Sequence, residues 1–266
     1  MLALVTGSTD GIGFATAEQL ASKGFSVLIH GRNEQRCNDS VEKIKLKYPE
    51  ADLDYVTADF SSLSQVEKTA DELNSRLASL DVLINNAGVF MPEKIITEDG
   101  FESTFQINYL APFFLTLKLQ PLLIKSGKGR IINVSSIAHK WADFDFGNLN
   151  GEKYYSGENS YALSKLCNIL FTYKHAVEME KFNVTVNALH PGVIGTKLLK
   201  IGWGMGGESI RKGSETSVYL AASEEVKNVT GKYFINKKET PSSPISYNKE
   251  LQEQLWNESL KMLNID

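Results

Sequence analysis

Short hydrophobic runs alternate with longer amphipathic stretches along most of the chain. The runs rich in β-branched and aliphatic residues predict strands at 2–6, 26–30, 53–57, 81–85, 130–135 and 183–189, with 232–235 as a candidate seventh. The stretches at 12–22, 34–48, 64–78 and 161–180 have helical periodicity. Such alternation indicates right-handed βαβ crossovers. We therefore predict one α/β domain spanning 1–266, with a doubly wound parallel sheet of about seven strands and helices on both faces.

Two segments interrupt this alternation. Residues 137–159 are rich in aromatic and turn-forming side chains, which predicts a substrate-loop insertion. Residues 193–213 combine glycines with bulky apolar side chains such as Trp203 and Met205, as expected of a mobile lid. Both segments are expected to border a substrate pocket. The amphipathic stretch 247–263 predicts a final helix that docks on its own domain.

A glycine-rich turn follows the first predicted strand directly. The run Thr6-Gly7-Ser8-Thr9-Asp10-Gly11-Ile12-Gly13 lies where a helix begins. Glycines at such a junction allow a sharp turn, close approach of a pyrophosphate and tight packing of the helix against the sheet. The turn predicts a Rossmann-type dinucleotide site at Gly7, Ser8, Gly11, Ile12 and Gly13.

The end of the second strand indicates which dinucleotide is preferred. NAD sites usually carry an acidic residue here to bind the ribose 2′-hydroxyl, whereas this chain has His30-Gly31-Arg32. A guanidinium without a neighbouring carboxylate attracts a 2′-phosphate. We therefore expect NADP(H) in preference to NAD(H), with Ser8 and Arg32 as contacts. A solvated arginine is the alternative, and Asp10 argues mildly against a phosphate nearby.

A candidate catalytic pair lies on one predicted helix. Tyr161 and Lys165 are four residues apart and so share a helix face. A fixed ammonium stabilises a phenolate and is expected to lower the pKa of Tyr161, which fits this side chain for proton exchange with a substrate oxygen. The strand before this helix ends in Ser135-Ser136, where a hydroxyl can hydrogen-bond that oxygen.

Together these motifs resemble the short-chain dehydrogenase/reductase family over essentially the full chain. The resemblance rests on Thr6-Gly7-x-x-x-Gly11-x-Gly13, Asp59, Asn85-Asn86-Ala87-Gly88, Asn108, Ser136, Tyr161-x-x-x-Lys165 and Pro191-Gly192, in family order. It implies catalytic roles for Asn108, Ser136, Tyr161 and Lys165. It also implies cofactor contacts from Asp59 and Phe60 near the adenine, from Asn86, Ala87 and Gly88 near the ribose, from Pro191, Gly192 and Thr196 near the nicotinamide, and from Tyr161 and Lys165. Ser135 is the alternative to Ser136.

The long Ser136–Tyr161 spacing, Ala138-His139 and Leu189-His190-Pro191-Gly192 are similar to the retinol dehydrogenase-like branch. That branch tends to act on bulky apolar carbonyls, and Val89, Phe90, Trp203 and Met205 favour the same class. Many of its members carry an N-terminal membrane anchor, for which we find no signal here. A cytoplasmic protein without a membrane anchor is the expectation.

Charge and cysteine content restrict which partners and bound groups the protein is expected to have. A net charge of −4 with scattered basic residues argues against nucleic acid as a partner. Cys37 and Cys167 are far apart and are expected to be reduced, and the four histidines have no metal-ligand spacing, so no metal site is predicted. The family resemblance implies a homodimer or homotetramer.

The sequence thus predicts an NADP(H)-dependent oxidoreductase that interconverts a small-molecule carbonyl and its alcohol. A cofactor-binding sensor or scaffold without turnover is the alternative. A sugar-nucleotide epimerase or dehydratase is disfavoured, because the glycine spacing differs and no larger C-terminal substrate region is present.

Overall fold

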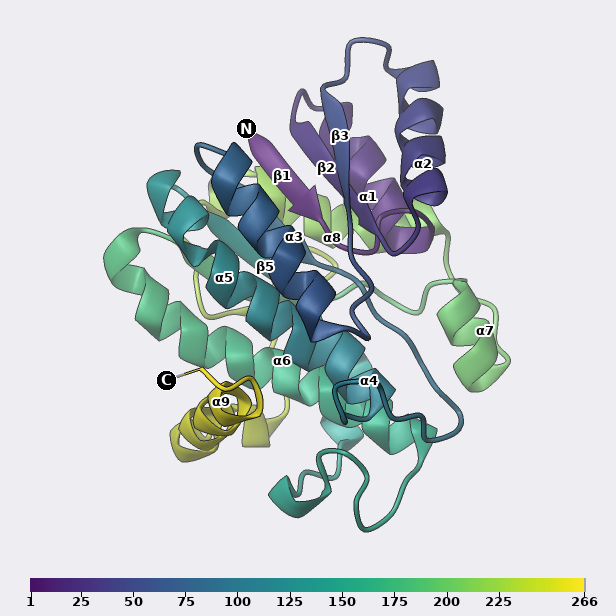
Figure 1. The fold of residues 1–266 in the computed structure, drawn as a ribbon, viewed down its shortest axis with the longest axis vertical. Helices are drawn as coiled ribbons and strands as arrows, with labels where there is room; N and C mark the ends of the chain where they lie inside the picture. Colours follow the sequence, from purple (N-terminus) through teal and green to yellow (C-terminus); the bar gives the residue numbers. More distant parts are fainter. Residues whose placement is uncertain (266) are drawn as a thin grey trace.

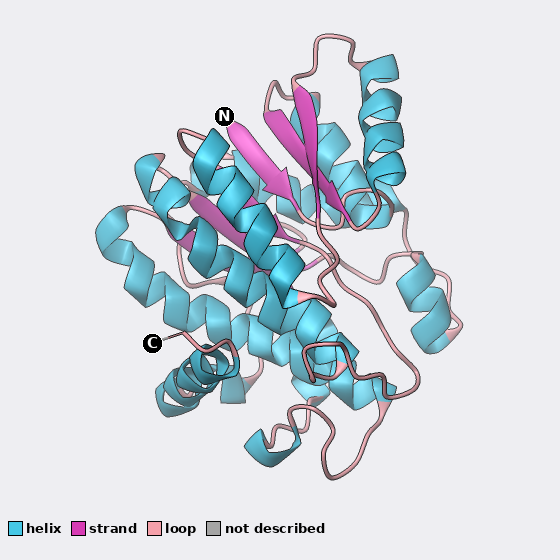
Figure 2. Cartoon of the chain, in the orientation of Figure 1, coloured by secondary structure: helices cyan, strands magenta, loops and turns pink. Residues whose placement is uncertain are grey.

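The computed structural model describes residues 1–265 and contains one sheet covered by helices on both faces (Figures 1 and 2). The eight strands have the order β3-β2-β1-β4-β5-β6-β7-β8. They are β1 (Leu2–Val5), β2 (Ser26–Gly31), β3 (Leu53–Thr57), β4 (Val82–Asn85), β5 (Arg130–Val134), β6 (Thr185–His190), β7 (Tyr233–Ile235) and β8 (Lys238–Glu239). The first seven run parallel, which confirms the predicted doubly wound sheet.

Strand β8 was not predicted. It is only two residues long and pairs antiparallel with β7. The connecting residues Asn236 and Lys237 both have positive φ, as a tight hairpin turn requires. A two-residue strand carries too little periodicity to be recognised in a sequence.

Helices connect the parallel strands, and a last helix follows β8. They are α1 (Gly11–Ala21), α2 (Glu34–Lys47), α3 (Leu63–Arg76), α4 (Ser103–Phe105), α5 (Ala111–Lys125), α6 (Gly157–Met179), α7 (Lys197–Trp203), α8 (Ile210–Ala222) and α9 (Lys249–Met262). A π-helical turn, Gln106–Leu110, joins α4 to α5. Helix α9 packs against α6 through Leu255 and Trp256, so the final helix docks on its own domain as predicted.

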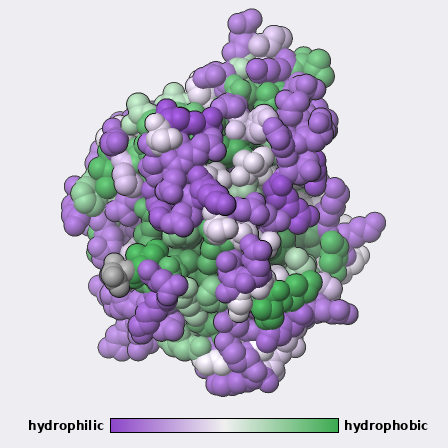
Figure 3. All heavy atoms as spheres, viewed as in Figure 1, coloured by the Kyte–Doolittle hydropathy of each residue, from purple (hydrophilic) through white to green (hydrophobic). Residues whose placement is uncertain are grey.

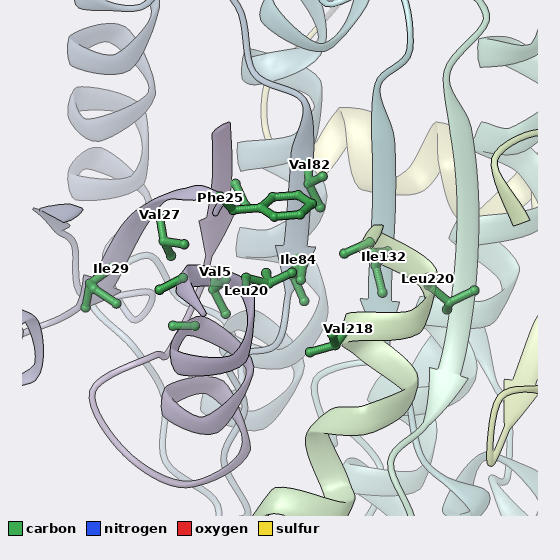
Figure 4. Packing of buried hydrophobic residues seen from close by; sticks show 14 of the residues in the cluster. Val5, Leu20, Phe25, Val27, Ile29, Val82, Ile84, Ile132, Val218 and Leu220 are labelled. Atoms are coloured by element: carbon green, nitrogen blue, oxygen red, sulfur yellow. The ribbon is translucent and has the colours of Figure 1, made fainter. Parts of the chain in front are cut away.

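Each face of the sheet has its own hydrophobic core. Val5 and Ile84 pack with α1, α2 and α8 on one face (Figure 4), while Leu4 and Leu83 pack with α3 and α5 on the other. Consecutive strand residues point to opposite faces, so strands covered on both sides are apolar at nearly every position. The outer surface in Figure 3 is mostly hydrophilic, with smaller hydrophobic patches between.

The segment 137–159 is only partly a loop. It contains two 3₁₀ helices, Ile137–Trp141 and Phe146–Asn148, and α6 begins at Gly157, four residues before the predicted start. Ser156 caps α6 by accepting a hydrogen bond from the Asn159 amide, which explains the earlier start. Helix α8 likewise begins inside the predicted lid region 193–213.

One helical stretch in the middle of the chain is unusually long and apolar. Residues 103–125 are long and apolar enough to cross a membrane by length and composition, but 67% of the apolar window is buried inside the fold. Burial of this kind is typical of a core helix in a globular domain. Cys37 and Cys167 are buried and unpaired, in line with the expectation of reduced thiols.

Candidate active site

A cavity of about 810 Å³ opens at the carboxyl ends of the parallel strands. The strand order reverses between β1 and β4, and open α/β sheets bind ligands at such a point. Every predicted site residue except Ser8 and Asn108 lines this cavity: Gly7, Gly11, Ile12, Gly13, Arg32, Asp59, Phe60, Asn86, Ala87, Gly88, Ser136, Tyr161, Lys165, Pro191, Gly192 and Thr196. Residues far apart in sequence therefore surround one space.

The glycine turn forms a close-fitting floor at one end of the cavity. Gly7 has φ +64°, and a Cβ there would lie 2.8 Å from the Ala87 Cα atom. A Cβ on Gly13 would lie 2.3 Å from the Gly7 oxygen and 2.5 Å from the Asn86 amide nitrogen. These contacts leave room only for glycine, and the floor they create fits a pyrophosphate above the start of α1.

Ser8 differs from the prediction. Its hydroxyl donates to the Val5 oxygen at 2.7 Å and accepts from the His30 amide at 2.9 Å, so the side chain points into the protein and is fully buried. It has no group available for a 2′-phosphate. Sequence patterns missed this inward orientation because the chain leaves β1 through the left-handed conformation of Gly7.

His30 supports the glycine turn from the neighbouring strand. Its Nδ1 accepts a hydrogen bond from the Gly7 amide at 3.1 Å, and its ring packs on Phe60 with centroids 4.6 Å apart. Burial lowers the pKa of His30 to about 4, which keeps the ring neutral and able to accept that bond.

Basic side chains gather at the same end of the cavity. Arg32 lines it as predicted, and Arg36 and Lys197, which sequence reasoning missed, join it. Lys197 Nζ lies 2.6 Å from an Asp10 carboxylate oxygen, and Arg36 lies 3.8 Å from the same oxygen. The bond to Lys197 is the main cause of the lowered pKa of Asp10. The negative charge of Asp10, which argued against a phosphate nearby, is thus offset by two cations.

The candidate catalytic side chains lie at the ends of β5 and on α6. The Lys165 ammonium donates to the Val134 oxygen at 3.0 Å and lies 5.5 Å from the centroid of the Tyr161 ring. The Ser135 hydroxyl donates to the Lys165 main-chain oxygen at 2.7 Å and is buried. Ser136 is only half-buried and lines the cavity together with Tyr161, so it has the better access to a ligand.

The pKa of Tyr161 is not lowered as expected. Burial raises it to about 12, offset only in part by Ser136, and burial lowers the pKa of Lys165 to about 8. The cost of removing both groups from water outweighs their mutual attraction, because the ammonium is directed at the Val134 carbonyl. Tyr161 is therefore protonated at neutral pH.

Asn108 lies behind the cavity wall, in the π-helical turn. Its side-chain oxygen accepts from the Val89 amide at 2.7 Å, and its side-chain nitrogen donates to the Val89 oxygen at 2.9 Å and to Ser164 at 3.0 Å. Its main-chain oxygen accepts from Asn168 at 2.9 Å. Asn168 was not predicted, although it shares a helix face with Tyr161 and Lys165 at i+7 and i+3.

The cavity also has an apolar wall. Val89, Met91, Trp141, Trp203 and Met205 line it. Among residues 1–265 there is no cluster of three or more side chains suited to hold a metal ion. An apolar wall of this kind favours ligands with a hydrophobic body next to the reacting group.

The chain is similar to known proteins over most of its length. The sequence profile described as short chain dehydrogenase matches residues 1–202. Human polyprenol dehydrogenase is 36% identical, with 99% of this chain and 85% of that protein covered, and human retinol dehydrogenase 14 is 35% identical, with 98% and 86% covered. A Beutenbergia cavernae protein assigned as an NAD(P)-dependent gluconate 5-dehydrogenase, solved with bound NADP, is 25% identical with a TM-score of 0.72, over 88% of this chain and 94% of that one.

Proposed function

Because the chain belongs to the short-chain dehydrogenase/reductase family, in the branch that includes the retinol dehydrogenases, we propose that it interconverts an apolar carbonyl and its alcohol with NADP(H). One observation carries the proposal. Tyr161, Lys165 and Ser136 line the same cavity as the glycine floor, at the carboxyl edge of the sheet. A cofactor on that floor and a carbonyl beside Tyr161 would share one cavity.

The protonation states favour Tyr161 as the acid of carbonyl reduction. The nicotinamide supplies the hydride when bound. A phenol with a pKa of about 12 holds its proton at neutral pH and gives it to the substrate oxygen as negative charge develops there. The Ser136 hydroxyl hydrogen-bonds the same oxygen, and the Lys165 ammonium stabilises the phenolate that remains. In alcohol oxidation the same groups act in reverse.

Three cations support the preference for NADP(H). Arg32, Arg36 and Lys197 line the adenosine end of the cavity, and no acidic residue ends β2. A 2′-phosphate carries a charge that suits this group, because Asp10 offsets only part of the group's positive charge. The pairing of Asp10 with Lys197 removes the main electrostatic objection to a phosphate.

The apolar wall supports a hydrophobic substrate. Two relatives act, by their names, on polyprenol and retinol, which are long apolar alcohols. A substrate of that class would place its hydrocarbon body along Met91, Trp141 and Met205. Burial of each methylene group contributes about 0.8 kcal/mol, so chain length is expected to affect KM strongly.

The proposal is tested by following NADPH and NADH oxidation with a panel of aliphatic, aromatic, steroid and retinoid carbonyls. We expect turnover with apolar carbonyls and NADPH, and a loss of at least about 100-fold in Tyr161→Phe. Tyr154→Phe is the matched control, since Tyr154 lies on an exposed loop and, among residues 1–265, its hydrogen bonds are with Asp143 and Asn148. Tight NADPH binding without oxidation by any carbonyl would favour the sensor or scaffold instead.

A further inference from the structure

His139 is a buried histidine between the candidate catalytic serine and the C-terminal part of the chain. It lies in the 3₁₀ helix that follows Ser136 and is only 1% exposed. Its ring Nδ1 lies 2.6 Å from the Ser136 main-chain oxygen, and its Nε2 accepts a hydrogen bond from the Ser243 amide at 2.9 Å. The ring also packs edge-on against Tyr233 of β7, with centroids 5.0 Å apart. It therefore connects segments that lie 104 residues apart in the sequence.

The two hydrogen bonds determine which ring nitrogen carries the proton. A main-chain amide can only donate, so Nε2 must be the unprotonated nitrogen that accepts from Ser243. A neutral imidazole then carries its proton on Nδ1, from which it donates to the Ser136 oxygen. Burial lowers the pKa of His139, which favours the neutral ring. Both nitrogens are thus satisfied only by the neutral tautomer that is protonated at Nδ1.

The Ser136 main chain is held on both sides. On the preceding side, the Ser135 amide donates to the Leu189 oxygen at 2.8 Å. On the following side, the Ser136 oxygen accepts from the His139 amide at 3.2 Å in addition to the ring. The Ser136 hydroxyl oxygen accepts from the Ala138 amide at 3.2 Å, which leaves the hydroxyl proton free to donate. The direction of this donor therefore depends on how firmly the turn after Ser136 is held.

The C-terminal partner of the ring is itself held by two helices. Ser242, next to Ser243, shares a hydrogen bond of 2.6 Å with the Tyr173 hydroxyl on α6. The Ser246 hydroxyl donates to the Ser243 oxygen at 2.6 Å, and the Gln252 side chain on α9 donates to the Ser246 oxygen at 2.8 Å. Figure 1 shows α9 beside α6, the helix that carries the candidate catalytic pair. The amide that faces Nε2 is therefore fixed relative to the active site.

We propose that His139 is a positioning residue that holds the Ser136 hydroxyl in place for the substrate oxygen, and that Ser243 selects the tautomer in which it does so. This inference rests on the proposed function. A proton on Nε2 would set two N–H donors against each other at Ser243 and would leave the Ser136 oxygen without the ring donor. Neither His139 nor Ser243 lines the cavity, so both act through Ser136.

The first test separates the two hydrogen bonds of the ring. His139→Asn keeps a side-chain N–H donor near the position of Nδ1, His139→Gln keeps an acceptor near the position of Nε2, and His139→Phe keeps neither. The assay uses NADPH and the carbonyl with the highest turnover in the panel. We expect kcat to fall about tenfold in the Phe and Gln variants, with KM for NADPH nearly unchanged, and to be largely restored in the Asn variant.

The second test leaves the histidine in place. Ser243 has φ −59°, a value that proline adopts, so Ser243→Pro removes the amide N–H without requiring a new backbone angle there. Without that donor the ring can carry its proton on either nitrogen, and the Ser136 oxygen loses its ring donor for part of the time. We expect a smaller loss in kcat than in His139→Phe.

The position of the ring proton can be observed without turnover. Nuclear magnetic resonance spectra that correlate ring nitrogens with ring protons distinguish the two tautomers in protein with isotope-labelled histidine, and the signals missing from His139→Asn identify the residue. We expect the tautomer protonated at Nδ1 in the wild type at pH 7 and a mixture of tautomers in Ser243→Pro. A wild-type ring protonated at Nε2 would overturn the proposal.

His175→Phe is the matched control, because it removes another buried histidine, whose ring stacks on Phe171. It should leave kcat unchanged. The positioning role is wrong if His139→Phe has the same kcat as this control, or if kcat follows melting temperature alone across the three His139 variants. Should His139→Phe fail to fold, the comparison of His139→Asn with His139→Gln decides the question in the same way.

The two proposals fail in different ways. If Tyr161→Phe keeps full turnover, the proposed function is wrong, and the tautomer spectrum alone then decides whether His139 holds Ser136. If Tyr161→Phe and Ser136→Ala lose turnover while all three His139 variants keep it, the reaction is right and the positioning role is wrong.

Discussion

The Lys165 ammonium lies 5.5 Å from the centre of the Tyr161 ring and, at the same time, donates a hydrogen bond to a main-chain oxygen. Burial lowers the pKa of Lys165 to about 8, so the lysine loses its charge at a pH where Tyr161 is still protonated. The lysine and not the tyrosine is therefore expected to set the upper pH limit of the reaction.

Carbonyl reduction should decline as pH rises above about 8. Below that pH the ammonium is present and stabilises the phenolate formed when Tyr161 gives up its proton; above it the stabilisation is lost. The check is kcat/KM for an apolar aldehyde from pH 6 to 10. A rate that stays level to pH 10 contradicts this assignment. Lys165→Met should reduce the rate at least about 100-fold at pH 7.

The two neighbouring serines should behave differently. Ser136→Ala removes the hydroxyl that faces the substrate oxygen, and we expect a loss of about 100-fold in kcat. Ser135→Ala removes a buried bond to α6 instead, which should cost about 1 kcal/mol in the free energy of unfolding with a smaller effect on kcat. Steady-state kinetics and urea titration of both variants decide the matter; the reverse ranking would make Ser135 the catalytic serine.

Arg32→Ala should raise KM for NADPH by about tenfold or more and leave KM for NADH nearly unchanged, because only NADPH carries the 2′-phosphate. Lys197→Met should act in the same direction, since it leaves Asp10 with a weaker counter-charge from Arg36. Arg211→Ala is the control, because Arg211 lies outside the cavity lining. Equal changes with both cofactors would argue against a 2′-phosphate site at this position.

Acid should unfold the protein cooperatively. Burial lowers the pKa of His30, His175 and His190 from an ordinary value of 6.5 to about 4. Between these values the unfolded chain binds protons that the folded one excludes, so stability present above pH 6.5 is lost as pH falls toward 4. The limiting slope is about 1.4 kcal/mol per pH unit for each histidine.

His175→Phe isolates one of these histidines. The ring stacks on Phe171 away from the cavity, so activity at pH 7 should remain, while the dependence of unfolding free energy on pH becomes shallower. Urea denaturation at pH 7, 6 and 5 measures this pH dependence of the unfolding free energy. An unchanged slope would show that His175 is not protonated on unfolding in this range.

Gly13→Ala should weaken both the fold and cofactor binding. Its Cβ would lie 2.3 Å from the Gly7 oxygen, and relieving that overlap costs about 1–3 kcal/mol and deforms the floor under the pyrophosphate. Gly206→Ala is the matched control, since its Cβ meets no atom within 4 Å. Melting temperature and NADPH titration should separate the two variants clearly.

Regular features of the fold could be predicted because they repeat. Six strands, the glycine turn and the Tyr161–Lys165 pair follow from periodicity or from fixed helical spacing, and each lies within a few residues of its predicted position. The predicted location of the cavity follows from a general rule about parallel sheets and needs no knowledge of individual side chains.

Features that depend on distant contacts could not be predicted. The pairing of Asp10 with Lys197 spans 187 residues, and the sequence around neither residue predicts it. The inward orientation of Ser8 and the raised pKa of Tyr161 both depend on burial, which a linear pattern does not report. The predicted direction of the Tyr161 pKa shift is wrong for that reason, because desolvation of the buried phenol outweighs the proximity of the Lys165 ammonium.

The π-helical turn at Gln106–Leu110 has a consequence for how this chain tolerates insertions and deletions. Loss of one residue there would restore an ordinary helix and rotate everything on one side of the turn by about 100° relative to the other. The Asn108 side chain would then lose its hydrogen bonds to both Val89 and Ser164. The length of this turn is therefore constrained as tightly as the identity of Asn108, because a deletion removes the same bonds that a substitution of the side chain would remove.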